Sequence, residues 1–135
     1  MLTYNKPLPP DDPLFAPFWA NARSRRLSIQ CCRACGDRRF PPGPVCPRCL
    51  SEDQDWDTVS GRGTLVSWVR FHRAYWAGFV QEIPYECCLV QLEEGPLLVS
   101  NFAGPPPAPL RSGLPLRVVF EDITDRYTLP KFVAA

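Results

Sequence analysis

The sequence has almost no excess charge and no long apolar run. Its 135 residues include 15 basic and 14 acidic side chains, so the net charge is only +1. No global field therefore attracts the chain to nucleic acid or to an anionic membrane, and a partner must be recognised locally. No stretch approaches the roughly 20 apolar residues of a membrane span, and the first ten residues lack the pattern of a leader peptide. We expect a cytoplasmic protein without membrane contact.

Histidine is also scarce, which limits the catalytic chemistry of the chain. His72 is the single histidine, and as a general base it would need a nucleophile and an orienting carboxylate beside it. A lone histidine at a strand end more often makes surface contacts or hydrogen bonds. Cys31 has no neighbouring base to take its proton, so it is a still weaker candidate. We therefore predict no catalytic residue.

Cysteine, by contrast, is abundant, and four of the seven cysteines form two Cys-x-x-Cys pairs. Cys32 and Cys35 make the first pair, and Cys46 and Cys49 make the second. Each pair points two thiolates at one centre, so together they supply the four tetrahedral ligands of a closed zinc site. Such a site has no open position for water or substrate, so the zinc should be structural. The alternatives are an iron centre, disulfides or unrelated cysteines.

Cys31 offers a second register for the first pair. Pairing Cys31 with Cys35 would give a longer spacing, whereas Cys32 with Cys35 repeats the spacing of the second pair. We therefore choose Cys32 and leave Cys31 as a free thiol. Gly36 follows the first pair, where the backbone often turns left-handed, and glycine adopts that conformation without steric cost. A reducing compartment would keep the three remaining cysteines free.

Residues 1–26 combine a proline-rich arm with a short helix. The arm buries little by itself, so it is either frayed or laid against another surface. After Pro13, apolar residues recur at spacings of three and four and form one helical stripe. The stripe consists of Leu14, Phe15, Phe18, Trp19 and Ala22. This helix packs on its own domain or docks on a partner, and both interpretations stay open because a small protein has little core to receive Phe18 and Trp19.

The remaining chain is predicted to be mainly β, with a zinc ribbon at 27–55 and a five-stranded OB-fold barrel at 56–135. Alternating apolar residues indicate a strand that enters the first Cys-x-x-Cys pair, and residues 38–40 return beside it. The polar segment 51–57 is predicted to be a short connector that leads into a strand. Turn signals and alternation predict the five barrel strands. Their expected bounds are 63–72, 85–93, 97–102, 115–121 and 127–132.

Residues 73–84 form the longest informative loop, between the first two barrel strands. Tyr75, Trp76 and Phe79 lie close together beside Arg73, and exposed aromatics next to an arginine are typical of binding surfaces. A loop that folds back to plug the barrel is one alternative. Stacking on the bases of a single-stranded nucleic acid is another, although the near-neutral charge weighs against it.

Several short motifs occur in one order along the chain. They are Phe18-Trp19, the double Cys-x-x-Cys, Ser60-Gly61-Arg62-Gly63-Thr64-Leu65, His72-Arg73, Ile83-Pro84-Tyr85, Leu92-Glu93-Glu94-Gly95, Val119-Phe120-Glu121-Asp122 and Leu129-Pro130-Lys131-Phe132. With these motifs, from about residue 12 to residue 133, the chain resembles the family of rubredoxin-like zinc ribbons fused to an OB-fold. That family was long a domain of unknown function.

The resemblance implies a helical arm, a ribbon with structural Zn²⁺ and an OB barrel. It also implies a non-catalytic accessory subunit of acyl-CoA enzymes, usually thiolase-like condensing or cleaving enzymes and sometimes hydratases or aldolases of steroid and fatty-acid breakdown. In such hetero-oligomers the partner carries the catalytic residues, and the accessory subunit stabilises it and lines the acyl-CoA channel. A single-stranded nucleic-acid binder is the alternative, and an independent acyl-CoA carrier or thioesterase ranks last.

Individual residues receive roles from this interpretation. Residues expected to contact the partner are Phe18, Trp19, His72 and Tyr75. Arg73 and Trp76 are expected at the shared acyl-CoA entrance, where Arg73 would meet a phosphate of coenzyme A.

The sequence departs from the family pattern at two places. Leu50 stands where a glycine often follows the last zinc cysteine, so the second knuckle is expected to be less regular. Cys87 and Cys88 replace aliphatic residues of the second barrel strand and are expected to be small core residues.

Removing zinc with a chelator should unfold the ribbon and abolish partner binding together, because two or three short strands cannot bury enough surface to fold without a metal. Circular dichroism and a binding assay on the chelated protein measure both effects. A chelated protein that keeps its fold and its partner would contradict the metal assignment.

Overall fold

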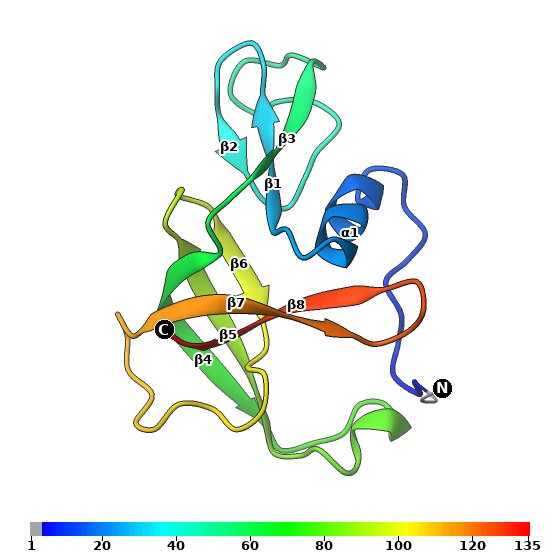
Figure 1. Cartoon of the computed structure of the whole chain (residues 1–135), viewed down its shortest axis with the longest axis vertical. Helices are drawn as coiled ribbons and strands as arrows, with labels where there is room; N and C mark the ends of the chain where they lie inside the picture. Colours follow the sequence, from blue (N-terminus) through cyan, green and yellow to red (C-terminus); the bar gives the residue numbers. More distant parts are fainter. Residues whose placement is uncertain (1–3) are drawn as a thin grey trace.

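The computed structural model describes residues 4–135, which form a short helix, a three-stranded ribbon and a five-stranded barrel (Figure 1). The helix is α1 (Ala16–Arg23), and the ribbon strands are β1 (Ser28–Cys32), β2 (Arg38–Arg39) and β3 (Gln54–Thr58). The barrel strands are β4 (Arg62–Phe71), β5 (Tyr85–Leu92), β6 (Leu97–Ser100), β7 (Pro115–Asp122) and β8 (Thr128–Ala134). Within these residues, no helix is long and apolar enough to span a membrane.

Helix α1 packs on the chain's own core. Pro17 lies at the helix start, where its missing N–H breaks no helical hydrogen bond. Phe18 is only 3% exposed, and its ring lies among core residues of both ribbon and barrel. The half-buried Trp19 packs edge-on against Phe18 and against Tyr127, which precedes β8. The expected docking of Phe18 on a partner is therefore wrong, because this chain already covers its ring.

The ribbon is centred on β1, which pairs antiparallel with β2 and with β3. The expected return strand at 38–40 is present as β2, but the expected connector at 51–57 is wrong. Most of it is β3, so the predicted boundary between residues 55 and 56 falls inside a strand. The acidic side chains of β3 form ion pairs with arginines, Asp55 with Arg33 and Asp57 with Arg38. Its polarity therefore reflects ion pairs with Arg33, just after β1, and with Arg38 of β2, rather than a loop.

The barrel is an antiparallel sheet in the order β6-β5-β4-β7-β8, and all five predicted strands are present with small shifts of their bounds. Its two edges meet just after β6, where Phe102 forms a parallel bridge with Phe132 of β8. Gly63 permits the close approach of β4 and β5, because a Cβ at this position would lie 2.5 Å from the carbonyl oxygen of Gln91. This curled sheet is an OB-fold.

One hydrophobic core joins the two modules. Phe18, Leu27 and Ile29 from the helix and ribbon belong to the same buried cluster as Leu65 and Phe132 of the barrel. The ribbon is therefore fixed on the barrel by packing as well as by the chain connection. Neither module has to bury its apolar face alone.

The two adjacent cysteines of β5 have different environments. Cys88 is 1% exposed, and burial raises the pKa of its thiol to about 11, as expected of an inert core residue. Cys87 points to the opposite face of the strand and is only half-buried. The expectation that both cysteines lie in the core is therefore correct for Cys88 and wrong for Cys87, because successive side chains of a strand face opposite sides.

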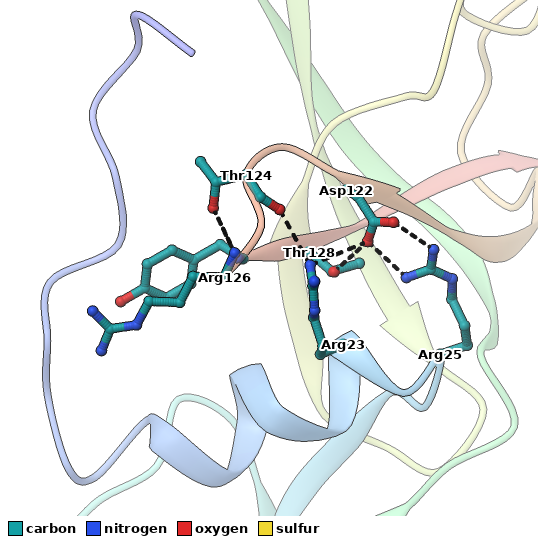
Figure 2. Close-up of polar contacts among 7 residues, drawn as sticks. Arg23, Arg25, Asp122, Thr124, Arg126 and Thr128 are labelled. Atoms are coloured by element: carbon teal, nitrogen blue, oxygen red, sulfur yellow. Dashed lines mark hydrogen bonds and ion pairs between the residues drawn. The ribbon is translucent and has the colours of Figure 1, made fainter. Parts of the chain in front are cut away.

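Polar contacts tie the segment after α1 to the barrel, as Figure 2 shows. Both terminal nitrogens of Arg25 donate to the Asp122 carboxylate of β7 at 2.8 Å. The Thr128 hydroxyl of β8 donates to the same carboxylate, and Arg23 donates to the carbonyl oxygen of Thr124 at 3.1 Å. The hydrogen bonds from Arg25 and Thr128 hold the pKa of Asp122 well below its usual range.

Replacing Asp122 by asparagine should lower the unfolding temperature at pH 7, and the difference from the wild type should shrink as the solution is acidified below pH 4. The depressed folded-state pKa of Asp122 makes its carboxylate stabilising above the unfolded-state value of about 3.9. That contribution is lost as the pH falls through the lower folded-state value. Thermal unfolding followed by circular dichroism across pH measures the difference.

The matched control is Asp125→Asn, which alters an exposed aspartate of the β7–β8 turn. Zinc release in acid affects the wild type and both variants alike, so the difference between them isolates the Asp122 contribution. Equal pH profiles for Asp122→Asn and the wild type would contradict this assignment.

Candidate functional site

Four cysteine sulfurs gather at the end of the ribbon. The Sγ atoms of Cys32, Cys35, Cys46 and Cys49 all lie within 4.8 Å of one another. The distances from Cys32 to Cys49 and from Cys35 to Cys46 are both 3.6 Å. Four sulfurs placed about 2.3 Å from a tetrahedral zinc would be roughly 3.8 Å apart, so the spacing fits this metal. The residues chosen from the sequence are therefore brought together, and Cys31 lies outside the group.

Backbone hydrogen bonds favour the thiolate form at two of these four cysteines, Cys32 and Cys46. Cys32 and Cys46 are buried, whereas Cys35 and Cys49 lie at the surface. The backbone amide of Cys35 hydrogen-bonds to the Cys32 sulfur and is the largest of several contributions that lower the pKa of Cys32 to about 6. Burial and the neighbouring sulfurs raise the pKa of Cys35 and Cys49. A thiolate, not a thiol, binds zinc, so the hydrogen bond to Cys32 favours the ligating form near neutral pH.

The two knuckles have the same backbone geometry, although different residues close them. The N–H of Gly36 donates to the Cys32 carbonyl oxygen, and the N–H of Leu50 donates to that of Cys46, both at 2.8 Å. Gly36 has a φ of 79° and Leu50 a φ of 66°. The second knuckle is therefore as regular as the first, contrary to expectation, because Leu50 itself adopts the left-handed conformation.

The aromatic loop, residues 72–84, extends beyond the ends of β4 and β5. Its backbone contains one 3₁₀ turn, η1 (Ala77–Phe79). Tyr85 stacks between Phe71 and Phe79, with ring centroids 5.1 Å and 4.9 Å apart. Tyr75 and Trp76 remain 60% and 56% exposed. The loop therefore keeps its most exposed rings outside the barrel instead of plugging it.

The polar residues of the aromatic loop are also exposed. Arg73 lies 5.2 Å from the centre of the Tyr75 ring, and its guanidinium stays accessible to an anion. His72 is exposed at the end of β4, and within residues 4–135 it has no hydrogen bond or ion pair.

The N-terminal arm crosses this loop, a contact that the sequence did not predict. Lys6 forms an ion pair with Glu82 and lies 5.1 Å from the centre of the Phe79 ring. A Cβ at Gly78 would lie 2.5 Å from the carbonyl oxygen of Asn5, so only glycine admits the arm here. The arm, the loop and the barrel end together surround a cavity of 480 Å³. No periodic pattern in the arm signals this contact.

A closed four-cysteine ribbon packed on an OB barrel defines a class of two-module zinc proteins whose metal is structural. Family models place the chain within this class. The model described as "ChsH2, rubredoxin-like zinc ribbon domain" matches residues 19–54, and the one described as "ChsH2, C-terminal OB-fold domain" matches residues 56–121. The chain belongs to this family, which also includes the DUF35 proteins, and its cofactor is structural zinc.

Individual relatives fall into two kinds. The chain is 42% identical over 118 residues to a "Probable enoyl-CoA hydratase alpha subunit" of Thermomonospora curvata, covering 85% of the chain and 36% of that protein. It is 30% identical over 108 residues to a "DUF35 domain-containing scaffold protein" of Pyrococcus furiosus, covering 80% of the chain and 79% of that protein. The chain spans about a third of the length of the hydratase subunits it matches.

A solved structure matches almost the whole fold. The chain superposes on one chain of the "Ltp2-ChsH2(DUF35) aldolase" with a TM-score of 0.85 and 36% identity. The match covers 94% of this chain and 98% of that one. Helix, ribbon and barrel are therefore arranged in the two proteins in the same way.

Leu50→Gly should raise the free energy of unfolding of the zinc-loaded protein by about 0.5 to 1 kcal/mol, and Gly36→Ala should lower it by about 1 kcal/mol. A left-handed φ strains any residue with a Cβ, and glycine relieves that strain at some entropic cost. A Cβ at Gly36 would meet no atom within 4 Å, so its effect is conformational rather than a clash. Denaturant unfolding in excess zinc measures both values.

Ala34→Gly is the control, because it introduces glycine into the first knuckle at a position whose φ is not positive. It should destabilise the protein slightly. A Leu50→Gly protein that is destabilised like Ala34→Gly would show that Leu50 is not strained.

Proposed function

We propose that this chain is a non-catalytic subunit that binds and stabilises an enzyme acting on acyl-CoA, of the Ltp2 aldolase or hydratase type. The observation that carries the proposal is the near-complete match to a chain of the Ltp2-ChsH2(DUF35) aldolase. The Pyrococcus relative, of which this chain covers 79%, is called a scaffold protein, which supports the same role. We place the complex in the cytoplasm, where thiolates remain available to zinc.

The chemistry of the described residues fits a supporting role. The four sulfurs of Cys32, Cys35, Cys46 and Cys49, which we propose as the zinc ligands, would fill the metal's coordination and leave no position for a substrate. The lone histidine lies beside no nucleophile among the described residues. In this proposal the enzyme partner supplies the reacting groups, and this subunit supplies a stable surface.

We propose the exposed part of the aromatic loop as one contact with that partner. Tyr75 and Trp76 present large rings to solvent, and such rings are frequent anchors of interfaces. His72 and the half-buried Trp19 are retained as secondary contacts, whereas Phe18 is not part of this surface. Arg73 would lie at the shared acyl-CoA entrance with Trp76, where its guanidinium can form a charge-assisted pair with a phosphate of coenzyme A.

Co-expression with an Ltp2-type subunit from the same organism should yield a complex with near-equal amounts of both chains. The isolated chain should turn over no acyl-CoA. Trp76→Ala should weaken the complex about tenfold, because it removes an exposed aromatic anchor. Arg73→Ala should raise the KM of the complex for acyl-CoA more than it changes assembly. Size-exclusion chromatography, titration calorimetry and steady-state kinetics measure these quantities.

Two results would contradict the proposal. One is the absence of a complex after nuclease treatment, with tight and salt-sensitive binding of the isolated chain to single-stranded oligonucleotides. The other is turnover of acyl-CoA by the isolated chain. Unchanged assembly and unchanged kinetics in both variants would contradict only the roles of Trp76 and Arg73.

A further inference from the structure

An apolar surface lies on the outside of the barrel, away from the core. It consists of Val69 on β4, Cys87 and Leu89 on β5, and Leu97 and Val99 on β6, and we refer to it as the outer face. Val69 pairs with Cys87 and Leu89 pairs with Val99, so their side chains are direct neighbours across adjacent strands. The exposed fractions are 68% for Val99, 56% for Val69 and 45% for Leu97. The patch is therefore continuous across three strands.

Most residues of the strands beneath this surface are apolar on both sides. The inward residues Cys88, Val90 and Leu98 fill the core of the barrel. The outward residues that alternate with them are apolar except for Gln91 of β5, and Ser67 of β4 lies opposite Leu89 on the same side. An antiparallel sheet with one solvated face normally has polar residues there, and strands that are apolar on both faces are normally covered on both. The Asn101 amide contacts the Cys87 sulfur at one border of the outer face. Val69, Leu97 and Val99 remain exposed, and the face is hollowed by a shallow pocket of 180 Å³.

The outer face continues into the aromatic loop. Phe71 and Tyr85 form the next pair on the same side of β4 and β5 after Val69 and Cys87. Their rings stack with centroids 5.1 Å apart, and Phe71 also contacts the ring of Tyr75 edge-on. An unbroken row of apolar and aromatic side chains therefore leads from Val99 at the sheet edge to the exposed rings of the loop.

We infer that the outer face and the aromatic loop form one docking surface, and that its occupant is an apolar patch of the enzyme subunit. This inference rests on the proposed function and names the surface that serves it. No charged side chain lies among the five residues of the outer face, so it can be desolvated at low cost. Charged residues occur beyond its ends, with the Arg62–Glu93 ion pair at one end and Arg73 at the other. An apolar centre with a polar rim is the usual anatomy of a protein–protein interface.

The lack of charge on the outer face favours a protein over a nucleic acid as its binding partner. A nucleic-acid strand is held by cations that follow its phosphates. The outer face offers none, and the net charge of the whole chain is only +1. An apolar protein surface can bury the outer face without needing such cations.

The test places one positive charge in the outer face. Val69→Lys and Val99→Lys should each weaken binding of the Ltp2-type subunit about tenfold or more, because a lysine at the centre of an apolar interface must be desolvated without a partner. Both positions are exposed, so folding should be preserved. The control is Leu50→Lys, which changes a residue that is 75% exposed on the ribbon and should alter binding less than threefold. Titration calorimetry measures the affinities, and circular dichroism and zinc content check the fold.

The outcomes separate this inference from the proposed function. Wild-type binding with selective loss in Val69→Lys and Val99→Lys supports the inference. Wild-type binding that both variants retain overturns it and leaves the proposed function intact. Failure of the wild type to bind overturns both. A wild-type dimer in sedimentation that Val99→Lys converts to a monomer, or oligonucleotide binding that Val99→Lys abolishes, would assign the outer face to another occupant and overturn the inference.

Discussion

The linkage of four thiolates through one structural zinc is the constraint on which the rest of this structure depends. β1, β2 and β3 contain only five, two and five residues, which is too little sheet to bury a core of its own. The metal closes the ribbon at one end, and packing against the barrel holds it at the other. β1 then carries Ile29 into the shared core at a fixed position, and α1 follows by packing on the same cluster.

The shared core explains why the chain behaves as one unit rather than two modules joined by a linker. Phe18 is covered by ribbon and barrel residues together, so the helix lies where the modules meet. The Arg25–Asp122 pair holds the turn after the helix to β7 at the surface. Apolar packing provides most of the free energy that holds the helix and ribbon on the barrel. The exposed ion pair contributes little energy and mainly fixes the orientation of the turn after the helix.

The proposed supporting role has different physical needs from catalysis, and the described residues fit that proposal. A four-cysteine zinc centre stabilises the fold without offering an open coordination position, and the single histidine is exposed. The unusual features of this chain lie on its surface. An apolar patch lies on the outside of β4, β5 and β6, and the loop that extends this surface presents Tyr75 and Trp76 to solvent. These features fit the proposed role in binding a partner.

The sequence by itself determined the parts that depend on local spacing. Two Cys-x-x-Cys pairs specify a four-sulfur site because each turn orients its own thiols, and alternation of apolar residues specifies the barrel strands because the side-chain period is fixed. Only the tertiary structure decided what depends on distant segments. The polar segment around Asp55 became a strand because β1 pairs with it, and because Arg33, just after β1, forms an ion pair with Asp55. Phe18 became core because ribbon and barrel meet over it. Val69 and Val99 became parts of one surface because β5 lies between their strands and pairs with both. The local sequence pattern does not indicate which apolar residues remain exposed after folding.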